Sequence, residues 1–174
     1  MMNCCYLWAY NYSNGMASDR NFSFTTLNLP PAQLRMRRDA SGRVRVYDRW
    51  RSRWVVLTPE EWVRQQFVSM LVTTRGYVSG RIANEVSLDL NGTPRRCDTV
   101  VYRYDGKPLM IVEYKAPEVV ITQAVFDQIA RYGMVLRAEY LTVSNGLQHF
   151  CCKIDYAAGT YCFLADIPDY SSIV

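Results

Sequence analysis

The chain of 174 residues lacks long apolar runs, has a single histidine and contains no Cys-x-x-Cys motif. No apolar run reaches the roughly 20 residues that a transmembrane helix needs. The N-terminus also lacks a basic segment followed by an apolar stretch, so it does not resemble a signal peptide. We therefore expect no membrane association and a cytoplasmic location.

The six cysteines are arranged in a way that favours neither disulfides nor zinc. Adjacent cysteines are poor partners for each other, and one histidine does not give the spacing of a Cys/His zinc site. We expect reduced thiols, several of them buried in strands. The positions are Cys4, Cys5, Cys97, Cys151, Cys152 and Cys162.

Hydrophobic residues make up 49% of the chain, which excludes wholesale disorder and predicts one domain with a substantial core. The net charge of +4 comes mainly from arginines, which cluster in one stretch. Guanidinium groups match phosphate geometry, so this stretch is a candidate nucleic-acid surface; a solvated β-ribbon is the alternative. The cluster consists of Arg35, Arg37, Arg38, Arg43, Arg45, Arg49, Arg51 and Arg53.

Residues 1–28 show no hydrophobic period, which predicts a poorly ordered N-terminal tail ahead of a single domain over residues 29–174. Residues 43–47 and 54–57 predict two short strands, which form an appended N-terminal β-hairpin. A helix then begins at Thr58-Pro59, where Glu61 completes a capping box. Apolar residues at helical spacing, from Val63 to Leu71, extend this helix to about residue 73.

Turn signals divide the rest of the chain into strands and one more helix. Asn91-Gly92 and Asp105-Gly106 separate strands over residues 82–90, 97–104 and 108–115. A helix over residues 122–136 leads to strands over 140–144 and 147–153, with an edge strand over 161–164. The order α-β-β-β-α-β predicts an α/β fold, with a mixed central sheet flanked by helices and a right-handed parallel crossover.

The hairpin around Asp105-Gly106 brings two acidic residues together. If these two residues form the loop, Asp98 lies directly opposite Glu113, with Cβ atoms about 4.5–5.5 Å apart. Two carboxylates at that distance repel, and a divalent cation supplies the compensating charge. Pro108 cannot donate to the ladder, and a slip of one residue would separate the pair.

Lys115 is two residues beyond Glu113 and shares its face of the strand, with Leu109 and Ile111 anchoring that face toward the core. A lysine beside two carboxylates can orient water or offset the charge that develops on a phosphate. The competing interpretation is an exposed acidic pair with Lys115 as a surface counter-ion.

Residues 96–101 (RCDTVV) and 106–117 (GKPLMIVEYKAP) resemble the core of the PD-(D/E)xK nucleases. More narrowly, residues 58–150 resemble the N-terminal nuclease domain of type I restriction enzyme R subunits in a stand-alone version. The resemblance implies a restriction-endonuclease-like fold, Mg²⁺ (replaceable by Mn²⁺) bound by Asp98 and Glu113, a catalytic Lys115, and DNA as partner. Cys97 stands where the family often has proline. The sequence contains no helicase motor, so we expect neither restriction nor translocation from the resemblance alone.

Further candidates are less specific. Gln128 and Tyr132 match the QxxxY element of some superfamily members, which implies a catalytic role; a polar flank and a core-edge tyrosine are the alternative. The resemblance favours Glu61 as an additional site residue, whereas helical phase favours Glu60. Glu85 is either a fourth acidic group or a surface residue. His149 is interpreted as a satisfied strand residue.

These observations predict a Mg²⁺-dependent endodeoxyribonuclease. The alternative is a catalytically weak or inactive nuclease-fold module that binds nucleic acid or a partner protein. A structural domain without nucleic acid is a third possibility, and a homo-oligomer stays open.

Overall fold

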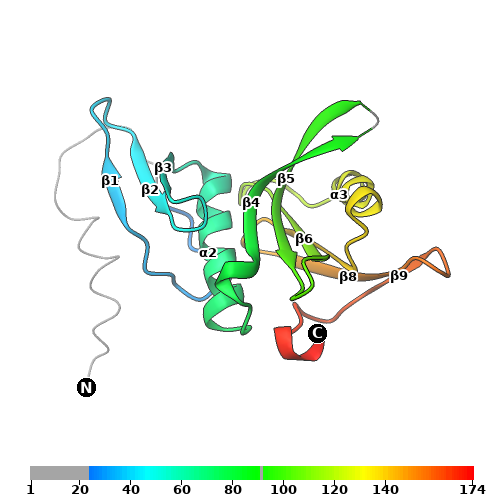
Figure 1. Ribbon diagram of the computed structural model, residues 1–174. Coiled ribbons are helices and arrows are strands. Elements are labelled where there is room, and N and C mark those ends of the chain that lie inside the picture. The colour runs from blue at the N-terminus through cyan, green and yellow to red at the C-terminus, as the bar shows by residue number, and fades with distance from the viewer. Residues whose placement is uncertain (1–23, 91) are drawn as a thin grey trace, which may run out of the picture.

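The computed structural model describes residues 24–90 and 92–174, and within these residues the chain forms two β-sheets and two α-helices (Figure 1). The smaller sheet has the order β1-β2-β3 and comprises β1 (Met36–Arg38), β2 (Val44–Asp48) and β3 (Arg53–Val56). The predicted hairpin corresponds to β2 and β3. The sequence did not reveal β1, because its three residues are too short to show alternation.

The larger sheet has the order β4-β5-β6-β7-β8-β9. The only parallel pair within it joins β6 to β7, the two strands on either side of α3, and this confirms the predicted crossover of parallel strands. The elements are α2 (Pro59–Thr73), the short helix η1 (Ser79–Arg81), β4 (Ile82–Leu90), β5 (Thr93–Tyr102), β6 (Pro108–Tyr114), α3 (Gln123–Leu136), β7 (Tyr140–Ser144), β8 (His149–Asp155), β9 (Thr160–Phe163) and η2 (Tyr170–Ser172).

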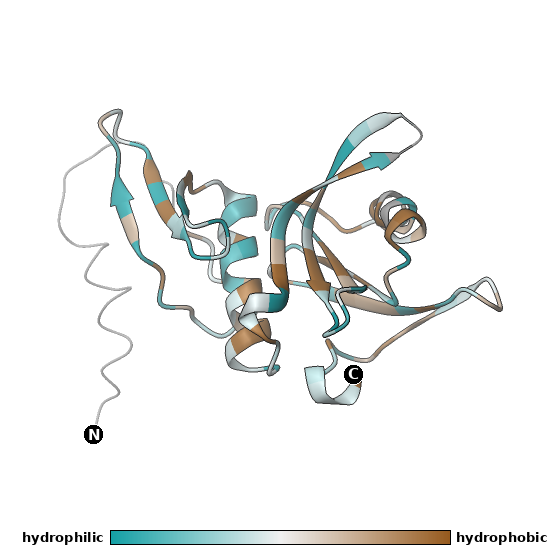
Figure 2. Ribbon diagram, in the orientation of Figure 1, coloured by the Kyte–Doolittle hydropathy of each residue, from teal (hydrophilic) through white to brown (hydrophobic). Residues whose placement is uncertain are grey.

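The two helices cover opposite faces of the six-stranded sheet. Phe67 of α2 packs in one buried cluster with Val112 and Tyr114 of β6. Ile129 of α3 packs in a second cluster with Ile111 of β6. Because neighbouring residues of β6 point into different clusters, this strand is buried on both faces, and the predicted helix–sheet–helix layering is confirmed. In Figure 2 the first turns of α2 are mainly hydrophilic, and its apolar residues gather in the C-terminal half of the helix.

The start of α2 follows the predicted capping chemistry. The backbone N–H of Glu61 donates to the Thr58 side chain at 3.1 Å, and Pro59 occupies the first turn. Thr122 stands at the equivalent position before α3, but its side chain makes no capping hydrogen bond. The two helices therefore begin with the same residue type and different local stabilisation.

The β5–β6 hairpin differs from the predicted two-residue loop. Arg103 N donates to Lys107 O at 2.8 Å, and Gly106 adopts φ +82°, so the loop has three residues. A bulge beyond Pro108 adds one residue to β6 and restores the expected register at Thr99–Val112. The two departures offset each other, so the predicted register holds up to Thr99–Val112, the pair directly before Asp98 and Glu113. The bulge also places Leu109 in the α2-side cluster, so its predicted alignment with Ile111 was wrong.

Of the predicted tail, residues 1–23 lie outside the described residues, whereas residues 24–28 contact the domain. The Trp62 indole N–H donates to Thr25 O at 3.1 Å, and Asn28 N donates to Gly146 O at 2.7 Å. Leu27 packs against the α2-side cluster. The packed part of the chain therefore begins before residue 29.

No helix in the described part of the chain is both long and apolar enough to cross a membrane. The cysteines in this part are free thiols: Cys97, Cys151 and Cys152 are buried in the large sheet, and Cys162 is exposed. This agrees with the predicted reduced state. Cys4 and Cys5 lie outside the described residues.

Candidate active site

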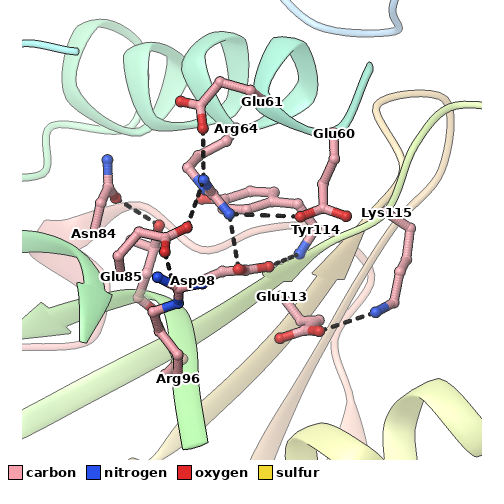
Figure 3. A network of polar contacts seen from close by, with 12 residues as sticks. Glu60, Glu61, Arg64, Asn84, Glu85, Arg96, Asp98, Glu113, Tyr114 and Lys115 are labelled. Carbon is pink, nitrogen blue, oxygen red and sulfur yellow. Dashed lines mark hydrogen bonds and ion pairs between the residues drawn. The ribbon is translucent and has the colours of Figure 1, made fainter. Parts of the chain in front are cut away.

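Asp98 lies where the β5–β6 ladder ends. The last paired residues are Thr99 and Val112, and two residues after Val112 the Tyr114 backbone N–H donates to Asp98 Oδ2 at 2.9 Å (Figure 3). The other carboxylate oxygen, Oδ1, accepts from Arg64 Nη2 of α2 at 2.7 Å. Both oxygens are therefore held in place by groups from neighbouring elements.

Glu113 lies beside Asp98 and is only 5% exposed (Figure 3). Burial, reinforced by the negative charge of Asp98, raises the pKa of Glu113 to about 7. Lys115 Nζ donates to Glu113 Oε1 at 3.0 Å. Burial alone would lower the pKa of Lys115, but the hydrogen bond to Glu113 outweighs it and raises the pKa, so this lysine stays protonated at neutral pH. The structure thus brings the three predicted residues together.

Arg64 is the buried cation that connects the acidic residues around Asp98. Besides Asp98, it pairs with Glu61 Oε2 at 2.6 Å and with Glu85 Oε1 at 2.9 Å. Burial would lower the pKa of Arg64, but the charge of Asp98 and of the other two carboxylates outweighs it and raises the pKa. Sequence reasoning missed this residue, although its position on the inner side of α2, one residue after Val63, was a weak signal.

Glu85 lies in line with Asp98 on the neighbouring strand, between the pairs Asn84–Thr99 and Val86–Cys97. Its backbone has φ +60°, a left-handed conformation that costs a non-glycine residue roughly 1–3 kcal/mol. In this conformation the Glu85 carboxylate forms ion pairs with Arg64 and with Arg96, the latter at 2.7 Å. Glu85 is therefore part of the charged network. The sequence left this open, because the direction of its side chain depends on whether the strand is regular.

Glu60 and Glu61 have different surroundings. Glu61 is buried, pairs with Arg51 and Arg64, and accepts from Gln65 Nε2 at 2.8 Å. Glu60 is half-exposed, and burial together with the charge of Asp98 raises its pKa. Figure 3 shows Glu60 pointing toward the carboxylate pair and Glu61 pointing away from it. The geometry places Glu60, rather than the predicted Glu61, beside Asp98 and Glu113.

The remaining candidates are Gln128, Tyr132 and His149. The side chains of Gln128 and Tyr132 lie outside the described residues, so their roles stay predictions. His149 Nδ1 lies 2.8 Å from Ser144 Oγ, and its Nε2 lies 3.0 Å from Asn28 O. Both ring nitrogens have partners away from the site, as expected for a satisfied strand histidine.

Asp98 and Glu113 offer two carboxylate ligands for a metal ion, not a complete set of protein ligands. Among the described residues, no three Asp, Glu, His or Cys side chains are close enough together to hold a metal ion. Mg²⁺ is commonly bound by one or two carboxylates, with water and substrate phosphate as further ligands. Two hard oxygen donors, one with its pKa raised by burial and by a neighbouring negative charge, fit such an ion. Asp98 and Glu113 are the residues that would hold it.

The charges around the pair leave an excess of negative charge. Six carboxylates and four cationic groups form this network, so with every group ionised its net charge is −2. A divalent cation matches this excess. The acids are Asp48, Glu60, Glu61, Glu85, Asp98 and Glu113, and the cations are Arg51, Arg64, Arg96 and Lys115.

Fold and site together define a mixed α/β domain with a carboxylate pair on adjacent central strands and a lysine directly after the second of these strands. Residues 59–168 match the family described as the type I restriction enzyme R protein N terminus (HSDR_N). The match covers more than half of the chain and all three central site residues, so the chain belongs to this family.

A solved structure supports the fold. It is the fragment structure of a protein assigned as an HsdR subunit of a type I restriction enzyme from Vibrio vulnificus YJ016. The TM-score is 0.50 at 18% identity, over 67% of this chain and 24% of that chain. This chain therefore corresponds to about a quarter of that fragment. No curated protein matches significantly.

Proposed function

We propose that the chain is a metal-dependent nuclease that hydrolyses phosphodiester bonds in DNA, built on a core of the PD-(D/E)xK type. The observation that carries the proposal is the buried Glu113, which lies beside Asp98 and within 3.0 Å of Lys115 Nζ. Membership of the type I R-subunit family supports the same conclusion, because restriction enzymes cut DNA.

The site residues have three roles: metal binding, orientation of the Asp98 carboxylate and stabilisation of negative charge on the phosphate. Asp98 and Glu113 would hold Mg²⁺ or Mn²⁺, which, when bound, polarises a phosphoryl oxygen and lowers the pKa of bound water. The Tyr114 N–H and Arg64 orient the Asp98 carboxylate. Lys115 stays protonated and offers its positive charge to the phosphate oxygens as negative charge develops there.

One contact favours a second candidate function, a catalytically weak module that binds nucleic acid or a partner subunit. Arg64 donates to Asp98 Oδ1 and thereby takes up one oxygen of the expected metal ligand. If this ion pair persists in the presence of Mg²⁺, Asp98 and Glu113 stabilise the fold and do not bind the metal ion needed for cleavage.

The first experiment incubates the purified chain with supercoiled plasmid and with single-stranded DNA, in Mg²⁺, in Mn²⁺ and in chelator. We expect cleavage only with metal, loss of cleavage in Asp98→Asn, and a fall of about a hundredfold or more in Lys115→Ala. Lys107→Ala is the matched control, because its amine pairs with Asp105 on the exposed hairpin loop.

A second readout separates metal binding from cleavage. Mg²⁺ should raise the melting temperature of the wild type and of Lys115→Ala, but not of Asp98→Asn, because a ligand that binds only the folded state stabilises it. Full cleavage by Lys115→Ala would overturn the assigned role of the lysine. Binding of DNA without cleavage under any metal would favour the second candidate function.

A further inference from the structure

The positive charge of this protein is concentrated in the small sheet. Residues 35–57 contain eight arginines and two aspartates, a net charge of +6, whereas the whole chain carries +4. The rest of the chain, which includes the candidate active site, is therefore slightly acidic. This stretch also lies outside residues 59–168, which match the R-subunit family.

Strand alternation gathers arginine and aromatic side chains on the outer face of the small sheet. Val46 and Asp48 of β2 are fully buried, so Arg45 and Tyr47 point to the opposite side. Arg37 is paired with Arg45 across β1–β2, and Trp54 is paired with Tyr47 across β2–β3.

Two arginines of this face stack on its aromatic rings. The Arg35 guanidinium lies 5.0 Å from the centre of the Tyr47 ring, and the Arg37 guanidinium lies 4.1 Å from the centre of the Trp54 ring. Stacking fixes the plane of a guanidinium while its N–H edge stays available for hydrogen bonds. Within residues 24–90 and 92–174, no carboxylate lies within ion-pair distance of Arg35 or Arg37, and both are exposed.

We propose that this arginine–aromatic face, formed by Arg35, Arg37, Arg45, Tyr47 and Trp54, binds the sugar–phosphate backbone of double-stranded nucleic acid without sequence preference. Arg45 is paired with Asp39 at 2.8 Å, so Arg35 and Arg37 provide the unpaired, oriented guanidiniums that contact phosphates. Because the arginines lie over the Tyr47 and Trp54 rings, phosphate contact rather than base stacking supplies the affinity. As a substrate-holding surface, the face rests on the proposed nuclease function; its binding does not require cleavage.

Buried contacts connect the small sheet to the candidate active site. Arg51, in the turn between β2 and β3, pairs with Asp48 and with Glu61 of α2. Asn84 of β4 donates to Asp48 Oδ2 at 3.2 Å. Figure 1 shows the small sheet beside α2, the helix that carries Arg64 to Asp98. Nucleic acid bound on the arginine–aromatic face is therefore held by a sheet that is fixed relative to the acidic pair.

The test measures how the affinity for a short DNA duplex depends on salt, by fluorescence anisotropy in chelator so that no cleavage occurs. The variant is the double substitution Arg35→Gln/Arg37→Gln. The matched control is Arg131→Gln/Lys153→Gln, which removes the same charge from exposed residues of α3 and β8. Each lost phosphate contact lowers the slope of log affinity against log salt by about 0.9, so the variant should lose about 1.8 and the control none.

Equal slopes in the variant and the control would overturn the proposal. Tighter binding of single-stranded DNA with quenching of tryptophan fluorescence would also overturn it, because that result assigns the affinity to base stacking. The outcome is independent of the nuclease test. A changed slope without metal-dependent cleavage supports the face and rejects the proposed nuclease function, whereas an unchanged slope with metal-dependent cleavage does the reverse.

Discussion

Glu113 is a carboxyl group whose ionisation is opposed by its surroundings. It is buried, and the negative charge of Asp98 lies beside it, so its pKa is raised from an ordinary 4.5 to about 7. Lys115 offsets only part of this effect. In the absence of metal, the folded chain therefore holds a proton at Glu113 at pH values where the unfolded chain has released it.

This proton makes the stability of the metal-free protein depend on pH. The contribution of Glu113 to the free energy of unfolding is fully present below pH 4.5 and is lost as the pH rises through about 7. One pKa unit corresponds to about 1.4 kcal/mol, so the loss is on the order of 3 kcal/mol. Urea denaturation in chelator across this range measures it.

The control is Glu113→Gln, which keeps the shape of the side chain and cannot titrate. Its stability relative to the wild type should rise as the pH rises from 4.5 to 7. If the difference between the two proteins stays constant across that range, Glu113 is not the buried acid that the structure describes.

At the scale of elements, the starts of α2 and α3 form a natural comparison. Both helices follow a threonine in extended conformation, but only the Thr58 hydroxyl accepts a backbone N–H of the first turn. Thr58 and Thr122 are the same residue type at the same position before a helix. Comparing the effect of replacing each one therefore measures the contribution of the capping hydrogen bond.

Thr58→Ala should therefore lower the free energy of unfolding by about 1 kcal/mol, because it leaves a backbone donor of α2 without its partner. Thr122→Ala should change the stability by clearly less than that. Chemical denaturation of the two variants under identical conditions checks the prediction, and equal losses would contradict it.

At the scale of the whole molecule, buried ion pairs join the small sheet to the large one. Arg51 contacts Asp48 within the small sheet and Glu61 on α2, and its side chain is only 10% exposed. Burial would raise the pKa of Asp48, but the backbone N–H and the charge of Arg51 outweigh it and lower the pKa. Asp48 is therefore ionised in the folded protein and depends on Arg51 for compensation.

Arg51→Met should destabilise the protein by about 3–5 kcal/mol, since it leaves two buried carboxylates without this partner. Lys107→Met, at the exposed pair with Asp105, should cost at most about 1 kcal/mol. Limited proteolysis should show faster cleavage before residue 58 in the Arg51 variant. Similar stability of the two variants would mean that the sheets are joined by other contacts.

Local sequence signals were sufficient for the order of the elements from β2 onward and for the proximity of Asp98, Glu113 and Lys115, whose roles stay predictions. Capping at Thr58, helical spacing along α2 and the glycine turns depend on interactions between residues close together in the chain, and each is visible in the sequence. The register of the hairpin next to Asp98 and Glu113 was also predicted correctly at Thr99–Val112, although the three-residue loop and the bulge beyond Pro108 were not. The register was nevertheless predictable, because shifting β6 by one residue against β5 would move its apolar side chains to the opposite face of the sheet.

Tertiary structure alone decided which other charged groups surround that pair. Arg64 meets Asp98 across 34 positions of sequence, and Glu85 turns toward Arg64 through a left-handed backbone conformation that no local pattern signals. The orientation of Glu60 toward the site, against the expectation for Glu61, depends on how α2 is placed on the sheet. A sequence encodes periodicity and capping locally, whereas the partner of a buried charge is set by packing between distant segments.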